Sequence, residues 1–263
     1  WKAKKPKEPF WKSPFGEGRP GWHIECSAMS MKYLGKTIDI HTGAVDLLFP
    51  HHENEIAQSE AATGKPFASF WVENGIMNLT GEKMSKSTKH FFSVEDICAQ
   101  VEPETLKFYL LSTHYRSPVE FNNERLAEAQ SALERLKNAM RNAAIATREM
   151  ESSRVLPARG ELHNTTVEVE KLFMEAMEDD FNSAKAVGHL FDLARALNKQ
   201  IEAGVGTPDE GAAMRAASER MKELGKILGL FWKDEVEREE FPPEVVELMR
   251  MREKARKDKQ WRH

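Results

Sequence analysis

The most regular feature of the sequence is a helical repeat of apolar residues in its second half. After Asn123, which we interpret as a helix cap, apolar side chains recur at steps of three and four residues. They are Leu126, Ala129, Leu133, Leu136, Met140 and Ala143. Similar stripes follow Asn182 and Thr207, and they consist of Val187, Leu190, Phe191, Ala194, Leu197 and Ile201, then Met214, Ala217, Met221, Leu224, Leu228 and Phe231. With a shorter helix near Val167–Met177, these stripes predict a four-helix bundle.

The stretch before this bundle carries two signals for helix starts. Ser93 and Asp96 are three residues apart, which is the spacing of a capping box, and they predict a short helix through Cys98. Pro103 suits the first turn of another helix, because the missing N–H of proline is not needed there. We therefore expect a helical connection between the N-terminal third and the bundle.

The N-terminal third has a different pattern. Thr37–His41 and Phe70–Leu79 have the β-branched and apolar content of strands, and His51–Ala62 predicts a helix ended by Gly64 and Pro66. Alternation of strand and helix predicts an α/β layer. The strands are too few for a complete doubly wound sheet.

Composition narrows the class of protein. The 263 residues carry 38 Lys and Arg against 42 Asp and Glu, a balance that excludes a histone-like polycation and still allows a local basic surface. Two cysteines give no disulfide framework, and no apolar run reaches the roughly 18 residues of a membrane span, so we expect a cytoplasmic protein. The chain starts at Trp1 and stops in mid-pattern at His263, so we interpret it as a piece of a longer protein.

One group of residues has the composition of a metal site. His51 and Glu55 are four apart, so on a helix they project from one face, and His52 and Glu55 at three apart do so as well. Cys26 would add a thiolate from a distant segment, and zinc accepts such a mixed set of sulfur, nitrogen and oxygen donors. A buried cysteine with a metal-free His–Glu pair explains the same spacing.

Two further motifs suit nucleotide chemistry. Lys83 and Lys86 flank a hydroxyl-bearing turn after a predicted strand, where ammonium groups can bind a polyphosphate; an exposed basic loop is the alternative. Gly43 follows a strand and Asp46 comes three residues later, a pattern that suits close approach to a nucleotide with the carboxylate on the ribose. A simple turn that needs Gly and Asp explains it equally well.

The sequence resembles the cysteinyl-tRNA synthetases, a family of class I aminoacyl-tRNA synthetases. Gly18–Met29 resembles the family's segment with a zinc cysteine, and Phe49–Ser59 resembles its zinc histidine and glutamate segment. Lys83–Ser87 (KMSKS) is the class I signature loop without substitution. The resemblance continues through Leu110–Pro118 and Asp179–Asn182, so it covers nearly the whole chain.

The resemblance implies a function and assigns roles to residues. The family activates cysteine with ATP and Mg²⁺ and transfers it to tRNA(Cys), and its fold is a Rossmann-type catalytic domain followed by helices. It implies one Zn²⁺ per parent subunit, bound by Cys26, His51 and Glu55, catalytic Lys83 and Lys86, and ATP contacts from Gly43, Asp46 and Lys86. It also implies a substrate pocket bounded by Trp22, His23, His41 and His52.

Two departures from the family pattern affect these expectations. Ala44 and Val45 stand where the family often has more glycine before Asp46. The family's first zinc cysteine and its His-Ile-Gly-His signature belong to an N-terminal half that this sequence does not contain, so we expect weak or partial zinc occupancy. Cys98 does not replace the missing ligand, because it follows the signature loop.

The resemblance also suggests a division of the chain. We expect the second half of the catalytic domain at 1–92, a connecting helical region at 93–122, the helical bundle at 123–232, and a linker with the start of the anticodon-side region at 233–263. The fold class is thus α/β followed by all-α. The chain is expected to be a fragment, without activity in isolation, of a monomeric parent enzyme.

Two other functions remain open at this point. A mycothiol-type cysteine ligase also joins cysteine through an adenylate, but to an amino sugar, and it shares much of this pattern. A non-catalytic fragment that binds tRNA or has a structural role is the other alternative. The long bundle and the basic stretch 249–263 favour the tRNA enzyme for the parent protein.

Overall fold

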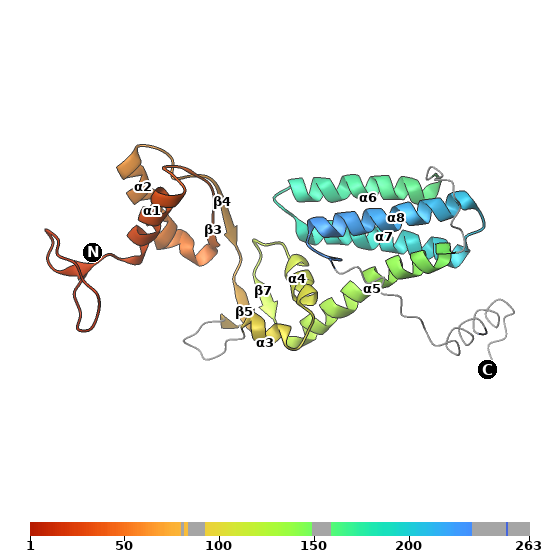
Figure 1. The fold of residues 1–263 in the computed structure, drawn as a ribbon, viewed down its shortest axis with the longest axis horizontal. Coiled ribbons are helices and arrows are strands. Elements are labelled where there is room, and N and C mark those ends of the chain that lie inside the picture. Colours follow the sequence, from red (N-terminus) through yellow and green to blue (C-terminus); the bar gives the residue numbers. More distant parts are fainter. Residues whose placement is uncertain (80–81, 84–92, 149–158, 233–250, 252–263) are drawn as a thin grey trace.

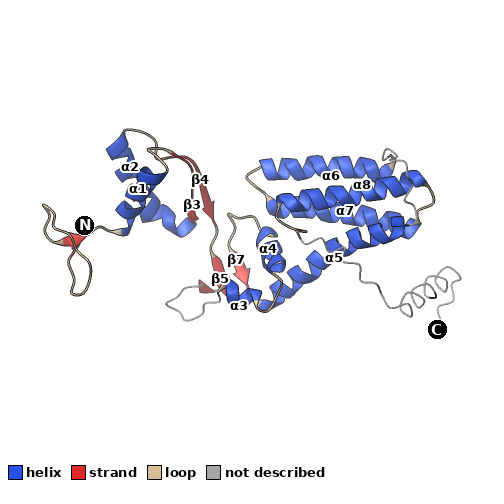
Figure 2. Cartoon of the chain, viewed as in Figure 1, coloured by secondary structure: helices blue, strands red, loops and turns tan. Residues whose placement is uncertain are grey.

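The computed structural model describes residues 1–79, 82–83, 93–148, 159–232 and 251. Figure 1 shows an elongated arrangement, in which an α/β part at the N-terminal end and a helical bundle are joined by a smaller connecting region. The order of classes along the chain is therefore α/β followed by helices, as the sequence predicts (Figure 2).

The α/β part is built around one strand–helix–strand unit. An antiparallel pair, β1 (Lys2–Ala3) and β2 (Gly18–Arg19), precedes helix α1 (Trp22–Tyr33). Strands β3 (Ile38–Ala44) and β4 (Ala68–Asn74) pair in parallel, and helix α2 (Glu53–Thr63) connects them. The register places His41 opposite Trp71 and Gly43 opposite Glu73, so these four side-chain positions share one face of the two-stranded sheet.

Helix α2 ends at Gly64 as the sequence predicts, but it begins at Glu53, two residues later than predicted. The φ of 66° at Gly64 is the left-handed cap conformation that glycine adopts without strain. Before it, helical turns at Val45–Leu47 and Leu48–His52 lead from β3 into the helix, and the Phe49–Pro50 peptide bond is cis. His51 and His52 thus lie in the turn that enters α2, ahead of its first residue.

The predicted strand at Phe70–Leu79 is two strands. β4 ends at Asn74, and β5 (Met77–Leu79) joins a second sheet in which it pairs with β6 (Glu82–Lys83) and with β7 (Val119–Phe121). Gly75 separates β4 from β5, and its N–H donates to the carbonyl of Tyr115 at 2.7 Å. A side chain at Gly75 would clash with the backbone of Ser117, so the chain passes close to its neighbour at this position.

The connecting region contains the two short helices predicted from their start signals. In α3 (Val94–Cys98), the Ser93 side chain accepts from the Asp96 N–H and the Asp96 carboxylate accepts from the Ser93 N–H, which completes the capping box. Helix α4 (Pro103–Leu111) has its proline in the first turn. Both predictions are confirmed.

The bundle consists of helices α5 (Asn123–Thr147), α6 (Glu161–Glu178), α7 (Ser183–Ala203) and α8 (Pro208–Ile227). Helix α6 is longer than the predicted 167–177 helix. The predicted cap at Asn123 is wrong by one residue, because Asn122 has the extended backbone of a cap and its side chain accepts from the Arg125 N–H at 2.8 Å. Asn182 and Thr207 cap α7 and α8 as predicted.

The predicted stripes form one core. Leu133, Leu136, Leu190 and Met221 are each at most 2% exposed and belong to a single cluster that includes residues of α4 and all four bundle helices. The α/β part differs sharply, because Ile38 and Phe67 are the only buried apolar residues among the described side chains of 1–78. Most of the buried apolar area of the described chain is therefore in the bundle and its junction with α4.

Polar contacts fasten the connecting region to the bundle at two places. At the α6–α7 turn, the Asp180 carboxylate accepts from the Tyr115 hydroxyl at 2.6 Å and from Arg116. At the other place, Glu104 of α4 is 3% exposed, pairs with Lys137 of α5 at 2.9 Å and accepts from the Phe231 N–H. The second contact is buried, and the first is open to solvent.

None of the described helices combines the length and apolar content that crossing a membrane requires. The linker and the start of the anticodon-side region that the sequence predicts at 233–263 lie outside the described residues, apart from the single position 251.

Candidate functional site

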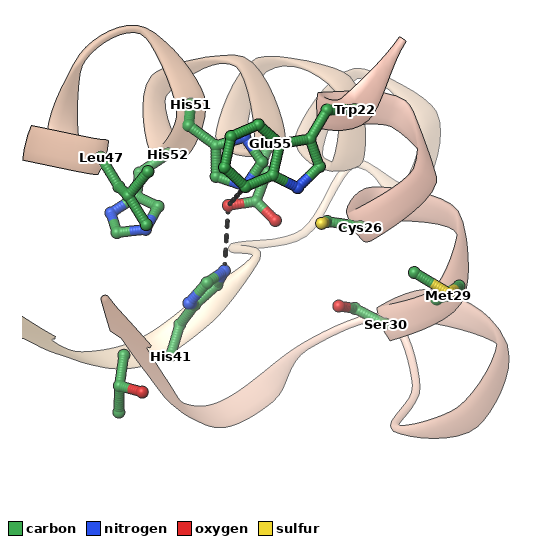
Figure 3. Close-up of a pocket in the computed structure, with 10 residues that line it drawn as sticks. Trp22, Cys26, Met29, Ser30, His41, Leu47, His51, His52 and Glu55 are labelled. Atoms are coloured by element: carbon green, nitrogen blue, oxygen red, sulfur yellow. Dashed lines mark hydrogen bonds and ion pairs between the residues drawn. The ribbon is translucent and has the colours of Figure 1, made fainter. Parts of the chain in front are cut away.

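A cavity of about 320 Å³ lies between α1, α2 and the end of β3 (Figure 3). Its walls combine aromatic and apolar side chains with ligand-type polar groups. The lining residues are Trp22, Cys26, Met29, Ser30, His41, Thr42, Leu47, His51, His52 and Glu55. Most of the residues that the sequence analysis singled out in the first sixty positions therefore meet in one place.

The three predicted zinc ligands are brought together in this cavity. One donor atom each from Cys26 on α1, His51 and Glu55 lies within 4.8 Å of the other two. His51 Nε2 is 3.5 Å from Glu55 Oε2, the contact expected for residues four apart on a helical face. Cys26 faces them across the cavity from the neighbouring helix (Figure 3).

His51 is held in place by two neighbours from α1. His23 Nδ1 lies 2.7 Å from His51 Nδ1, so one of these nitrogens donates to the other. The Trp22 ring lies against the His51 ring with centroids 4.4 Å apart. With Nδ1 occupied, Nε2 is the nitrogen that His51 presents to Glu55 and Cys26.

Burial sets the protonation behaviour of the thiol and the imidazole. The pKa of His51 is lowered, because burial disfavours the charged ring more strongly than Glu55 favours it. The pKa of the Cys26 thiol is raised, first by burial and then by the negative charge of Glu55. Without a cation the neutral thiol is therefore favoured, and binding of a metal ion would release its proton.

Glu55 is the central acceptor of the site. It is 1% exposed, and its Oε2 lies 3.0 Å from His41 Nε2 in addition to the contact with His51. A buried carboxylate requires such partners, because its desolvation is costly. Figure 3 shows His41 reaching Glu55 from β3, on the side of the cavity opposite Trp22.

His52 has different surroundings from His51. Its Nδ1 lies 2.8 Å from Glu73 Oε1 on β4, and the pair is 2% and 8% exposed. Sequence reasoning missed Glu73; the available signal was an acidic residue within a predicted strand, and its position opposite Gly43 emerges only from the structure. A ring nitrogen of His52 also falls within 4.8 Å of donor atoms of His41 and Glu55.

Gly43 and Asp46 lie next to the cavity and are not among its lining residues. A Cβ at Gly43 would lie 2.5 Å from the His52 ring, so packing of His52 by itself requires a glycine there. Asp46 is exposed on the turn that follows β3. Their assignment to ATP stays a prediction.

The structure describes only one of the two signature lysines. Lys83 ends β6, next to the strand β5 that continues the chain from β4. Lys86 lies outside the described residues. Their catalytic role therefore also stays a prediction.

The residues present fit a zinc ion. Thiolate, imidazole and carboxylate are the donors that Zn²⁺ prefers, and three protein ligands with an open position are typical of catalytic zinc sites. The His23–His51 contact matches the hydrogen-bonded support that metal-binding histidines usually have. The chemistry of the donor set, together with its convergence in one cavity, supports the assignment.

Comparison with family models first establishes the class of the chain. Residues 1–131 match the family described as tRNA synthetases class I (C) catalytic domain, and residues 172–232 match the DALR domain. Solved structures agree in fold. The Mycobacterium tuberculosis methionyl-tRNA synthetase in complex with methionyl-adenylate has a TM-score of 0.55 at 15% identity, with 73% of this chain and 40% of that chain covered. The Agrobacterium radiobacter K84 LeuRS ternary complex gives 0.55 at 16%, with 73% and 27% covered.

Sequence relatives then give the family. The chain is 49% identical to the cysteine--tRNA ligase of Geobacter metallireducens, over 88% of this chain and 48% of the relative. It is 45% identical to that of Pelobacter propionicus, over 100% of this chain and 57% of the relative. The chain belongs to the cysteine--tRNA ligase family of class I aminoacyl-tRNA synthetases. It spans about half the length of these relatives, and they give no support to the amino-sugar ligase.

Proposed function

We propose that this chain acts in the ATP-dependent activation of cysteine and its transfer to tRNA(Cys), and that it supplies the zinc-binding part of the cysteine pocket. The observation that carries the proposal is the meeting of Cys26, His51 and Glu55 in one cavity beside Trp22. The family membership of the chain supports the same reaction.

The zinc site explains how cysteine would be selected. Zn²⁺, when bound, supplies a Lewis acid that takes the substrate thiolate as a ligand and does not readily take the hydroxyl of serine. Cys26, His51 and Glu55 would hold the ion, and His23 and His41, which contact His51 and Glu55, would orient two of these ligands. Trp22 and Met29 line the cavity and would form the apolar wall against which the short cysteine side chain packs.

Adenylate formation would use the lysine loop. The carboxylate of cysteine attacks the α-phosphate of ATP, and negative charge moves onto the departing pyrophosphate, which Mg²⁺ also binds. Lys86, with Lys83, would neutralise this charge. Gly43 and Asp46, beside the cavity, would contact the ATP adenosine.

The proposed partners are tRNA(Cys), cysteine and ATP. We also propose that the protein is cytoplasmic and monomeric. The bundle α5–α8 would give the tRNA a rigid support next to the catalytic part. Aminoacylation of tRNA(Cys) by the full-length enzyme tests the proposed reaction, and a full-length protein that binds tRNA(Cys) without charging it would favour a non-catalytic role.

Binding of cysteine to the zinc-loaded chain is the most direct test. Calorimetric titration is expected to show cysteine binding, with serine bound at least tenfold more weakly because it offers no thiolate. Glu55→Gln should lose both zinc and cysteine binding, and Glu60→Gln, on the same helix, should keep both. Equal affinity for serine and cysteine would contradict the proposal.

The lysine loop is tested separately. In the full-length enzyme, Lys86→Ala should slow cysteine-dependent ATP–pyrophosphate exchange by about 10²–10³-fold, the usual effect of losing one contact to transition-state charge. Cysteine binding should be nearly unchanged. Lys36→Ala, which removes a lysine that precedes β3, serves as the control. Exchange at the wild-type rate in Lys86→Ala would exclude the assigned role.

A further inference from the structure

The chain turns back on itself directly after α8. Residues 228–231, here called the return segment, follow the end of the helix, and the Leu230 N–H donates to the Gly225 carbonyl at 2.9 Å. Leu230 is fully buried and Phe231 is 4% exposed, whereas Trp232, the next residue, is 55% exposed. The chain is therefore anchored in the core up to Phe231 and leaves the bundle at Trp232.

Two charged side chains of α4 hold the backbone of the return segment. Glu104 accepts a hydrogen bond from the Phe231 N–H, and Lys107 Nζ donates to the Gly229 carbonyl at 2.9 Å. Glu104 and Lys107 are three residues apart, so they lie on the same side of α4. Phe231 has a φ of 57°, which is uncommon for a residue with a side chain and persists only where neighbouring contacts enforce it. The position of the return segment thus depends on a side chain 127 residues earlier in the sequence.

Glu104 binds the bundle as well. It is 3% exposed, and its second carboxylate oxygen lies 2.9 Å from Nζ of Lys137 on α5. A buried ion pair often adds no net stability over apolar residues of similar size, because both charges lose their hydration. The contact is nevertheless specific in geometry, because one oxygen accepts from Lys137 and the other from Phe231. Glu104 therefore joins α4, α5 and the return segment in one arrangement.

This contact links two regions that the family comparisons separate. Helix α4 lies within residues 1–131, which match the class I catalytic domain, and the return segment lies at the end of residues 172–232, which match the DALR domain. The sequence that follows becomes basic, because residues 249–263 contain seven Lys and Arg against two Asp and Glu. Clustered positive charge of this kind suits RNA phosphates. Along the sequence, the return segment thus lies between the catalytic region and a stretch suited to RNA.

We propose that Glu104 is a positioning residue for tRNA binding. With Lys107 it fixes the point and direction at which the chain leaves the bundle, and thereby the placement of the part after Trp232 relative to the cysteine cavity. The inference rests on the proposed function, since it requires that the full-length enzyme charges tRNA(Cys). Cysteine activation uses the cavity of the α/β part and does not depend on Glu104. Binding of tRNA, which must reach both regions at once, does depend on it.

Kinetics of the full-length enzyme separate position from stability. In Glu104→Gln the side chain no longer neutralises Lys137, and we expect KM for tRNA(Cys) to rise about tenfold, as when one molecule in ten keeps the binding arrangement. Cysteine-dependent ATP–pyrophosphate exchange should keep the wild-type rate, whereas a general loss of stability would lower both activities alike. Glu161→Gln is the matched control. It breaks an ion pair of 2.9 Å between α6 and α7, and it should change neither activity.

A double variant keeps the test valid if Glu104→Gln does not fold. Glu104→Met/Lys137→Met replaces the buried pair by apolar side chains, so the fold should persist while the Phe231 N–H loses its acceptor. The Phe231 amide should then exchange deuterium faster, and KM for tRNA(Cys) should rise as in the single variant. An unchanged KM for tRNA(Cys) in the folded double variant, or an equal loss of pyrophosphate exchange, would overturn the proposal. A wild-type enzyme that does not charge tRNA(Cys) would instead refute the proposed function, and this inference with it.

Discussion

At the scale of single residues, the histidines of the cavity differ in which ring nitrogen a neighbour occupies. His23 contacts Nδ1 of His51, Glu73 contacts Nδ1 of His52, and His41 directs its Nε2 to Glu55. The histidine rings of the cavity therefore differ in which nitrogen remains available to a ligand. An imidazole whose second nitrogen is fixed is a better metal ligand than one that rotates freely.

Loss of His23 should weaken zinc binding without removing a ligand. His23→Ala frees Nδ1 of His51, and we expect the zinc dissociation constant to rise about 10–100-fold. Competition with a chromophoric chelator measures it. His163→Ala, outside the cavity, should leave the constant unchanged, and an equally unchanged value for His23→Ala would show that the contact does not support the site.

Sequence reasoning found Cys26, His51 and Glu55 because their spacing and their family motifs are local. It left open whether His51 or His52 joins Glu55, and the geometry brings a nitrogen of each ring near that carboxylate in two different groups. Glu73 could not be found in this way. Its contact with His52 depends on the register of β3 against β4 and on the turn before α2, which the sequence alone does not give.

The structure leaves no room for a side chain at Gly75. In Gly75→Ala, the new Cβ would lie 2.2 Å from the Ser117 carbonyl oxygen, so we expect a loss of about 1–3 kcal/mol, typical of overpacking. Gly188→Ala on α7 is the matched control. Nothing lies within 4 Å of its new Cβ, and alanine should stabilise the helix by about 0.5–1 kcal/mol. Urea unfolding midpoints should move in opposite directions.

At the scale of elements, prediction succeeded where one face of a helix is buried. Helices α5, α7 and α8 could be predicted because their apolar residues recur at the helical period and are separated by polar residues. Helix α1 was not predicted, for a physical reason. Its one buried residue is Ser27, and Trp22 and Met29 are more than half exposed, so no apolar stripe marks it.

Leu133 tests the bundle core against the surface of the same helix. It is 2% exposed, and Leu133→Ala should destabilise the chain by about 2–5 kcal/mol through lost burial and a residual cavity. Ile145, also on α5, is 55% exposed, and Ile145→Ala should change stability by no more than about 0.5 kcal/mol. Similar losses for both variants in urea unfolding would contradict the arrangement of α5.

At the scale of the whole molecule, the connecting region and the bundle are joined by side chains far apart in sequence. Asp180, in the turn between α6 and α7, has a φ of 57°, a conformation uncommon for a residue with a side chain. Its carboxylate reaches Tyr115 and Arg116, which follow α4. This contact follows no helical or strand periodicity. The placement of the connecting region against the bundle was therefore not predictable from the sequence.

The contact of Asp180 with Tyr115 and Arg116 should lower the titration midpoint of the Asp180 carboxyl group. The Arg116 guanidinium and then the Tyr115 hydroxyl hold the pKa of Asp180 at about 2, below its ordinary value. Because the folded-state pKa is depressed, the stabilisation is complete above the unfolded pKa of about 3.9 and is lost as the pH falls toward 2.

Carboxyl NMR measures this midpoint directly. In Arg116→Ala, the Asp180 midpoint should rise toward its ordinary value. Arg125→Ala, which removes a guanidinium that pairs with Glu120, should leave it unchanged. An Asp180 midpoint near 4 in the wild-type protein would mean that its contacts with Arg116 and Tyr115 are not formed in solution.

The uneven burial along the chain determines which backbone amides exchange with solvent first. Ile38 and Phe67 are the buried apolar residues among the described side chains of 1–78, whereas α5–α8 share an extensive core. Amides of β3, β4 and α2 should therefore exchange deuterium through local opening of low free energy, and those in the middle of α7 only through global unfolding. The ligand cavity thus lies in the part of the molecule that opens most readily, so an ion bound there should slow exchange in β3 and α2 and leave α7 unchanged.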